Sequence, residues 1–167
     1  GLFVNQAPEH KELPRQIAFN IIPQIDDFLD DGFTEAEARL SQELRRLVDV
    51  DIQVVATCVR APVFAGHAAT VNIELAEALD VTQARQILRE SPGVMVFDRR
   101  DEEGGYATPL AVVGEWATYV SRIREDPTVA NGLTFWTAAD NLRAGGALVA
   151  VRIAELLVNR GALAPGD

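Results

Sequence analysis

Two side chains in one short stretch of this sequence are of types that carry out substrate chemistry. Arg60 and His67 are separated by Ala-Pro-Val-Phe-Ala-Gly. A guanidinium binds a carboxylate through two parallel hydrogen bonds, and an imidazole exchanges protons near neutral pH. Pro62 and Gly66 restrict the backbone between them, which favours a fixed loop. The stretch therefore fits a site that binds an acid and moves a proton.

Each of these residues also has an ordinary structural interpretation. An isolated loop histidine is usually exposed or held in a structural contact, and Arg60 could form a salt bridge to one of the 25 acidic residues. Cys58 lies in a valine-rich run, so we expect a small buried hydrophobe with a raised thiol pKa and not a nucleophile. His10 is expected to be solvated. Two distant histidines and one cysteine predict no metal site.

The composition limits the class of protein. A length of 167 residues fits one domain, and no apolar run approaches the length of a membrane span. The net charge of -10 disfavours nucleic acid and anionic lipid as partners. A single cysteine excludes an internal disulfide and favours a reducing, cytoplasmic location. The start of the chain lacks the pattern of a secretory signal, and its missing Met suggests a processed chain or a domain of something longer.

The pattern along the chain predicts an arm or linker over residues 1–14 and one compact domain over 15–167. Three helices are expected. The first begins at a Thr34–Glu37 capping box, the second is capped by Asp80 or Thr82 and ends at Pro92-Gly93, and the last is capped by Asp140 or Asn141 and ends at Gly161. Gln16–Ile22 is mostly apolar and stops at Pro23, which fits a strand or a short buried stretch. The other expected strands are Ile52–Val59, Thr70–Leu75, Val94–Phe97, Leu110–Val113, Thr118–Ile123 and Leu133–Ala138.

Strands clustered between few helices predict an α+β fold with a mixed or antiparallel sheet and helices on one face. A dinucleotide-binding fold would instead need a glycine-rich turn between a first strand and a helix. Gly145-Gly146 is expected inside the last helix and Gly161 in the tail, so neither has that context. The chain alone is therefore not expected to bind NADP tightly. The last helix also carries more apolar residues than a lone domain needs, namely Leu148, Val151, Ile153, Leu156 and Leu157.

Several short motifs occur in order along nearly the whole chain and together resemble the aspartate-semialdehyde dehydrogenases of bacteria. They are Arg15-Gln-Ile-Ala-Phe-Asn-Ile-Ile-Pro23, Ala56-Thr-Cys-Val-Arg-Ala-Pro-Val-Phe-Ala-Gly-His67, Val71-Asn-Ile-Glu74, Ser91-Pro-Gly-Val94, Arg122-Ile-Arg124 with Asp126-Pro127, Asn131-Gly-Leu133 with Trp136, and Asp140-Asn-Leu142. Any one of these motifs would be weak evidence, but the ordered set is specific.

The resemblance implies an enzyme that reduces aspartyl β-phosphate to the semialdehyde with NADPH, on the route to lysine, threonine and methionine. A cysteine thiolate attacks the acyl carbon, and a histidine transfers the proton. By position, His67 would be that acid–base group and Arg60 would bind the α-carboxylate of the substrate. The resemblance also implies a C-terminal domain like that of glyceraldehyde-3-phosphate dehydrogenase, which supplies a homodimer interface.

The sequence departs from this family in three respects. The catalytic cysteine and the nucleotide-binding half are absent. A glutamate that binds substrate and a lysine that binds phosphate are replaced by Ala36 and Arg39, although Arg39 still suits a phosphate and Glu37 could substitute for the glutamate. In the last helix, Ala144 and Val149 replace a lysine and an asparagine. The chain is expected to be inactive alone, and the alternative to a dehydrogenase domain is a degenerate or engineered stand-alone dimerisation module.

Overall fold

The computed structural model describes residues 12–162, and the chain divides into two compact units. The first unit ends at Pro62 and the second begins at Val63. Most of the predicted arm of residues 1–14 lies outside the described residues, so its boundary at Pro14 stays a prediction. The division at Pro62 falls within the single domain that the sequence pattern predicts from residue 15 onward.

The first unit is built around helix α1, Glu35–Leu47, which begins as the sequence predicts. The backbone N–H of Glu37 donates to the Thr34 hydroxyl at 3.4 Å, and the Thr34 N–H donates to the Glu37 carboxylate at 2.8 Å. Each residue thus satisfies a backbone donor that the first turn of the helix leaves without a partner. The capping box is confirmed, and Glu35 and Glu37 place negative charge at the positive end of the helix dipole.

Neither alternative predicted for Gln16–Ile22, a strand or a short buried stretch, is correct, because only Ile22 is buried there. The chain turns at Phe19, where φ is 59°, and only Ile22 pairs with another segment, through an isolated bridge to Arg60. The Asn20 side chain donates to the Gln16 carbonyl at 2.8 Å and accepts from the Ile21 N–H at 2.9 Å. These local side-chain bonds compete with ladder formation, as is usual for asparagine.

The predicted buried strand Ile52–Val59 is also wrong. No strand is assigned to this segment, and its residues alternate between exposed and half-buried. Val55 is 78% exposed. Valine and isoleucine favour strands because they pack well on a pleated, half-buried surface, and no neighbouring strand forms a ladder with this segment. Its β-branched composition therefore does not produce a strand.

The second unit contains a four-stranded mixed sheet in the order β1-β4-β3-β2. The strands are β1 His67–Glu74, β2 Val94–Val96, β3 Thr118–Asp126 and β4 Gly132–Ala139. β4 pairs antiparallel with β1 and β3, and β2 runs parallel to β3. Four of the predicted strands are thereby confirmed, and none of their bounds differs from the prediction by more than three residues. The α+β class and the mixed sheet are confirmed as well.

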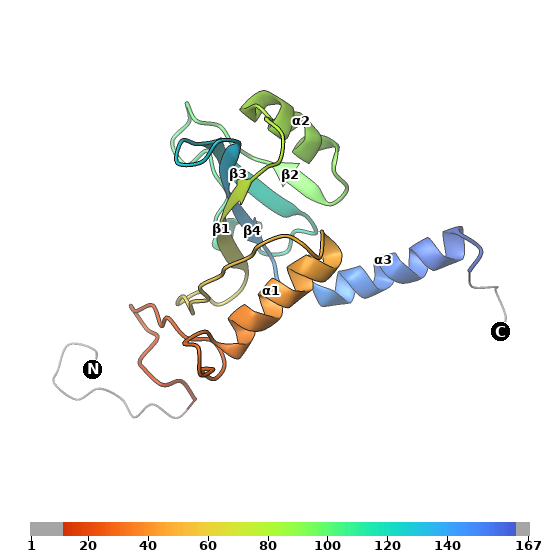
Figure 1. Cartoon of the computed structure of the whole chain (residues 1–167). Helices are drawn as coiled ribbons and strands as arrows, with labels where there is room; N and C mark the ends of the chain where they lie inside the picture. The colour runs from red at the N-terminus through yellow and green to blue at the C-terminus, as the bar shows by residue number, and fades with distance from the viewer. Residues whose placement is uncertain (1–11, 163–167) are drawn as a thin grey trace. The chain divides into compact units, whose positions relative to one another are not determined.

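Helix α2, Val81–Glu90, packs against β2 and β3 on one face of this sheet (Figure 1). Asp80 caps it and accepts from the Thr82 and Gln83 N–H groups, so the first of the two predicted caps is the one used. The main core cluster lies between helix and sheet. Its buried members are Ala84, Val120, Ile123 and Leu133.

The opposite face of the sheet carries no helix of this kind but a loop and a short 3-10 helix. The loop closes through the Asp98–Tyr106 bridge, and the Ala107 N–H donates to the Ser121 hydroxyl at 2.9 Å. Leu110–Val112 forms the 3-10 helix η1, so the strand predicted there is wrong. Pro109 precedes it with φ at −51°, a value that the pyrrolidine ring sets and that suits a helical turn.

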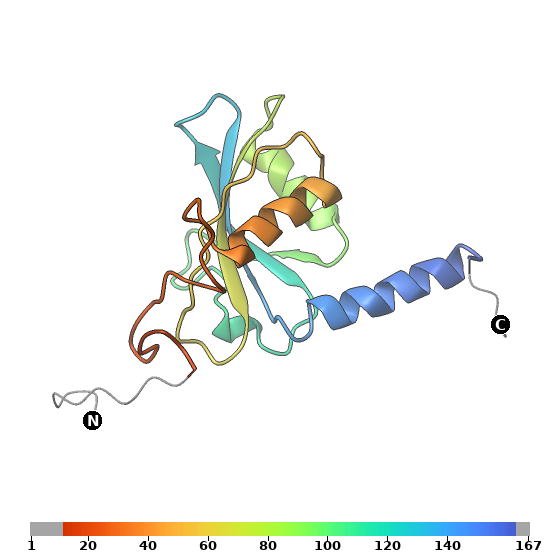
Figure 2. The same ribbon diagram turned by 60° about the horizontal axis from the view of Figure 1, so that its bottom comes forward.

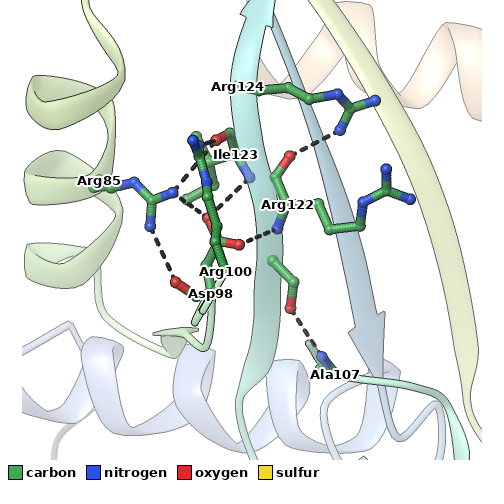
Figure 3. A network of polar contacts seen from close by, with 8 residues as sticks. Arg85, Asp98, Arg100, Ala107, Arg122, Ile123 and Arg124 are labelled. Carbon is green, nitrogen blue, oxygen red and sulfur yellow. Dashed lines mark hydrogen bonds and ion pairs between the residues drawn. The ribbon is translucent and has the colours of Figure 1, made fainter. Parts of the chain in front are cut away.

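Strand β3 contains a β-bulge between Ser121 and Arg124. Arg122 has φ at 56°, an uncommon conformation for a residue with a side chain. The Asp98 carboxylate accepts from the Arg122 N–H at 2.8 Å and from the Ile123 N–H at 3.1 Å, and it pairs with the Arg85 guanidinium of α2 (Figure 3). One carboxylate therefore holds the bulge open and ties the helix to it.

Helix α3, Gly146–Asn159, begins later than predicted. Gly145 is its N-cap, whereas Asp140 and Asn141 lie in the preceding turn, so the predicted cap is wrong. Gly145-Gly146 consequently lies at the start of a helix that follows a strand, and not inside the helix. The end before Gly161, where φ is 66°, agrees with the prediction.

None of the α3 residues is buried, and the exposed ones include Val151, Ile153, Leu156 and Leu157. The ribbon of α3, in blue, extends away from the turn that follows β4 (Figure 2). The apolar surplus predicted for this helix is confirmed as exposed surface. Within residues 12–162, none of the helices combines the length and the apolar character needed to cross a bilayer.

We predict that Asp98→Asn lowers the free energy of unfolding by about 3–5 kcal/mol, because it removes one partner of a buried ion pair and weakens the acceptor for the bulge. The side chain of Asp98 is 3% exposed and that of Arg85 is 17% exposed. The control is Glu102→Gln, which removes an exposed pair with Arg99 and should cost less than about 1 kcal/mol. Urea unfolding measures both changes, and equal losses would contradict the assignment.

Candidate functional site

His67 is the first residue of β1 and is exposed, rather than lying within the predicted loop. The Gly66 N–H before it donates to the Asn141 side-chain oxygen at 3.0 Å. Gly66 has φ at 84°, and a Cβ there would lie 3.0 Å from the Pro109 carbonyl oxygen and 3.2 Å from that of Ala139. Only glycine fits this approach. The backbone before the imidazole is thereby fixed against the end of β4.

Asp140, the residue before Asn141, holds the turn that follows β4. Its carboxylate is buried and accepts from the Gly114 N–H at 2.7 Å, the Leu142 N–H at 2.8 Å and the Arg143 N–H at 3.3 Å. The hydrogen bond from Gly114, followed by that from Leu142, lowers the pKa of Asp140 below its usual value. Within the Asp140-Asn-Leu142 motif, Asn141 therefore holds the Gly66 backbone before β1, whereas Asp140 holds its own turn and Gly114 and does not cap α3.

Glu37 is buried and both of its carboxylate oxygens are occupied by backbone donors. One accepts from the Cys58 N–H at 2.7 Å and the other from the Thr34 N–H. These two bonds, that of Cys58 first, lower the pKa of Glu37 below its ordinary value. The geometry favours a positioning role, in which Glu37 ties α1 to the segment before Arg60. Its contact with substrate stays a prediction.

Cys58 itself has the properties expected of a structural residue. It is half-buried, and burial raises the pKa of its thiol, with further increases from the negative charges of Glu37 and Asp26. A raised pKa leaves little thiolate at neutral pH. The prediction that Cys58 is not a nucleophile is consistent with this environment.

Arg60 is half-buried, and its backbone forms both hydrogen bonds of the bridge to Ile22, at 2.8 and 3.0 Å. No carboxylate within residues 12–162 forms an ion pair with it. The salt bridge considered from the sequence is therefore not seen in this part of the chain. Arg39 is exposed and pairs with Asp26 at 3.3 Å. Its proposed phosphate contact stays a prediction.

Arg60 belongs to the first compact unit and His67 to the second. Their joint contact with one substrate therefore stays a prediction. Gly66 restricts the backbone as the sequence predicts, whereas the positioning role of Asn141 was missed, because Asp140 and Asn141 were interpreted as caps of the last helix. The signal was present, because the Asp-Asn-Leu motif was visible and a glycine directly preceded the histidine. In the described part of the chain, no three His, Cys, Asp or Glu side chains gather where a metal ion could bind.

Comparison with known proteins gives a consistent result. The family described as "Semialdehyde dehydrogenase, dimerisation domain" matches residues 2–144. The chain belongs to this family. The aspartate-semialdehyde dehydrogenase of Aquifex aeolicus is 41% identical over 157 residues, which cover 93% of this chain and 46% of that protein. That of Rickettsia conorii is 42% identical over 149 residues, covering 89% of this chain and 44% of that protein.

Solved structures agree with the sequence relatives. Aspartate semialdehyde dehydrogenase II from Vibrio cholerae superimposes with a TM-score of 0.84 at 38% identity, covering 92% of this chain and 45% of that one. The Candida albicans enzyme, solved with NADP, has a TM-score of 0.67 at 22% identity and shows likeness of fold alone. The predicted fold is confirmed. The chain spans a little under half the length of the relatives it matches.

Within this semialdehyde dehydrogenase dimerisation domain, the three apolar residues that replace expected polar ones, Ala36, Ala144 and Val149, have different surroundings. Ala36 is half-buried in the first turn of α1, and Ala144 is half-buried in the turn before α3. Val149 is 49% exposed on α3. None of these side chains can donate or accept a hydrogen bond. The polar groups that the resemblance implies at these positions are absent from the domain.

The low pKa of Glu37 predicts a pH dependence of stability. A carboxylate whose folded pKa lies below its unfolded value stabilises the fold above the ordinary value of 4.5, and this contribution disappears as pH falls through the folded pKa. We therefore expect Glu37→Gln to be less stable than the wild type at pH 7, and the difference to shrink towards pH 3. Thermal unfolding at a series of pH values measures it.

The matched control for this measurement is Glu35→Gln, an exposed residue in the same helical turn. Its difference from the wild type should be smaller. A difference for Glu37→Gln that stays constant from pH 7 to pH 3 would contradict the role of the carboxylate charge. Hydrogen exchange of the Cys58 amide gives a local readout, because that N–H loses its charged acceptor.

Proposed function

We propose that this chain is the C-terminal, dimerisation and substrate-binding part of an NADP-dependent aspartate-semialdehyde dehydrogenase. The observation that carries the proposal is the match of about nine-tenths of the chain to a little under half of such enzymes. The remaining half would supply the catalytic cysteine and the nucleotide site. The reaction would belong to amino-acid biosynthesis in the cytoplasm, with the chain assembled as a homodimer.

Two features of the chain support the assignment of NADP binding and hydride transfer to the other half of the enzyme. The sequence contains no G-x-G-x-x-G turn, so NADP has no binding site of this kind here and the hydride chemistry belongs to the other half. Helix α3 exposes a run of apolar side chains that an isolated domain would bury. A further polypeptide segment packing on α3 would remove this surface from water.

Three residues of this chain would bind the substrate and transfer its proton. Arg60, with no carboxylate partner among residues 12–162, would hold the α-carboxylate of aspartate semialdehyde. His67, exposed behind the fixed Gly66 backbone, would donate and accept the proton as the acyl–enzyme forms and breaks. Arg39 would contact phosphate after releasing Asp26, an exchange that an exposed ion pair permits at small cost.

A chimera tests this proposal directly. The matching segment of the Aquifex aeolicus enzyme is replaced by this chain, and NADP reduction by aspartate semialdehyde in phosphate is assayed. We expect activity, with kcat about 100-fold lower in His67→Asn because the acid–base group is lost. In Arg60→Ala, kcat/KM should fall by about tenfold or more, because a charge-assisted bidentate contact is lost.

The matched control in the same chimera is Arg46→Ala, an exposed arginine near the end of α1, which should leave both parameters unchanged. A chimera that is folded and dimeric but reduces no NADP would reject the enzyme proposal. It would favour the second candidate, a non-catalytic dimerisation module, which the loss of polar groups at Ala36, Ala144 and Val149 supports.

Restoring the lost polar groups provides a separate prediction. Ala36→Glu, Ala144→Lys and Val149→Asn together should raise kcat/KM of the chimera by about tenfold, because each returns a hydrogen-bonding group to the position that the resemblance implies. Ala147→Lys, at an exposed position of the same helix as Val149, is the control for added charge. An unchanged or lower kcat/KM in the triple variant would show that these positions no longer face the reacting groups.

A further inference from the structure

The residue before His67 must meet two requirements that conflict. Gly66 has φ at 84°, and a Cβ there would lie 3.0 Å from the Pro109 carbonyl oxygen, so this position accepts only glycine. Glycine adopts positive and negative φ about equally readily, so its own backbone does not fix one conformation. The backbone that leads into His67 therefore needs support from other residues.

The loop before Gly66 provides little of this support. Its large apolar residues are Val63 and Phe64, and both are exposed. Within residues 12–162, neither belongs to the two core clusters of the second unit. Segments with few buried apolar contacts open locally at a low cost in free energy. The hydrophobic contacts of this loop therefore do not fix the conformation of Gly66.

The side chain of Asn141 supplies the support. His67 pairs with Ala139, the last residue of β4, and the backbone ladder between β1 and β4 ends at this pair. The Gly66 N–H lies one residue beyond the ladder, and the Asn141 side-chain oxygen accepts from it at 3.0 Å. A side chain thus replaces the missing backbone acceptor at the position that precedes the imidazole.

Asn141 is itself fixed by the turn that contains it. The Asp140 carboxylate is buried and accepts from the Gly114 N–H at 2.7 Å and from the Arg143 N–H at 3.3 Å. The Arg143 guanidinium lies over the Trp116 ring, 4.8 Å from its centroid. The bond to Gly114 and the contact with Trp116 connect the turn to the loop that follows η1. The acceptor oxygen therefore lies in a braced turn.

We propose that Asn141 is a positioning residue for proton transfer by His67. By holding the Gly66 backbone, it keeps the Cα of His67, and the imidazole that extends from it, in one place relative to the substrate. The inference rests on the proposed function, to which it adds a residue that acts through the backbone. An acid–base group works within hydrogen-bond reach of the proton it transfers, and a displacement of about 1 Å can lower the rate by about 100-fold.

Asn131 makes an equivalent contact at the opposite end of the same two strands. Its side-chain NH2 group donates to the Leu75 carbonyl at 3.1 Å, next to Glu74, the last residue of β1. The 8 residues of β1 span about 25 Å, so this contact lies far from His67. Changing either asparagine to alanine removes a bond between an amide side chain and the backbone. Only the change at Asn141 affects the backbone beside His67.

The kinetic test uses the chimera with the other half of the Aquifex aeolicus enzyme. We expect Asn141→Ala to lower kcat by about tenfold and to change KM by less than about threefold, because a displaced imidazole affects the chemical step more than substrate binding. Asn131→Ala should leave kcat within about twofold of the wild type, because distant sites act independently. Similar shifts of the urea midpoint in the two variants would show that the difference in kcat does not arise from loss of the fold.

Two further variants separate the hydrogen bond from the volume of the side chain. Asn141→Asp keeps an oxygen that accepts from the Gly66 N–H, so kcat should return to within about threefold of the wild type. Asn141→Leu has a similar size but no acceptor, so its kcat should be as low as that of Asn141→Ala. If Asn141→Ala does not fold, Asn141→Leu replaces it in every comparison.

Hydrogen exchange of the Gly66 amide tests the contact without any assay of activity. In this chain, Asn141→Ala and Asn141→Leu should raise the exchange rate by about tenfold, because the amide loses its acceptor. Asn141→Asp and Asn131→Ala should leave the rate close to that of the wild type. The NMR order parameters of the Gly66 and His67 N–H groups should fall only in the variants that lose the acceptor.

Three results would overturn the inference. Unchanged exchange of Gly66 in Asn141→Ala would show that the hydrogen bond does not hold this backbone. A normal kcat in Asn141→Ala, with stability lowered as in Asn131→Ala, would give Asn141 a purely structural role. A low kcat in Asn141→Asp, with Gly66 still protected, would assign the effect to the lost NH2 group. A wild-type chimera without activity would reject the proposed function and with it the role in proton transfer, whereas the exchange of Gly66 would still decide whether the contact exists.

Discussion

The carboxylate of Asp98 is the interaction on which the second unit depends most. It lies at a point where three elements meet and where regular pairing fails, because the bulge in β3 leaves the Arg122 and Ile123 N–H groups without ladder partners. A buried donor without an acceptor costs about 1–3 kcal/mol. Asp98 supplies the acceptor for both, and the Arg85 guanidinium compensates its charge. These two hydrogen bonds hold the bulge. The bulge directs the Ile123 side chain into the core and the side chains of Arg122 and Arg124 away from it.

The same device recurs elsewhere in the chain. Glu37 accepts from the Thr34 and Cys58 N–H groups, and Asp140 accepts from Gly114 and Leu142. In each case a buried carboxylate replaces missing backbone pairing at a junction between elements. Hydrogen bonds to charged acceptors are stronger than those to neutral ones. The acidic composition of the chain is therefore partly structural.

Sequence patterns predicted the elements that depend on local rules. The Thr34 capping box, the Asp80 cap and the strands around Thr70–Leu75 and Leu133–Ala138 depend on the chemistry of adjacent residues or on alternation within one face. Two of the errors arose where contacts with distant residues decide the structure. Ile52–Val59 has the composition of a strand, but no neighbouring strand pairs with it. Asp140 has the residue type of a helix cap, but its carboxylate accepts hydrogen bonds from a turn and from the Gly114 N–H. No local pattern reveals such partners.

In the candidate site, too, some features depend on adjacent residues and others on residues far along the chain. The spacing of Arg60 and His67 within a string of ordered motifs identified the family, and the match over residues 2–144 confirms it. The environment of the two residues could not be predicted from their types. Gly66 is required because the backbone approaches Pro109 and Ala139, which lie more than 40 positions away along the chain, and Asn141 supplies its acceptor. The motif that contains His67 is thus recognised from adjacent residues, whereas the position of the backbone before it depends on residues far along the chain.

The exposed apolar residues of α3 connect the fold to the length of the relatives. A folded domain that ends in an amphipathic helix buries the apolar face of that helix on its own core. Here none of the α3 residues is buried, although its composition is the most apolar of the three helices. The chain spans a little under half of the enzymes it matches, so the surface that α3 would need is expected in the other half.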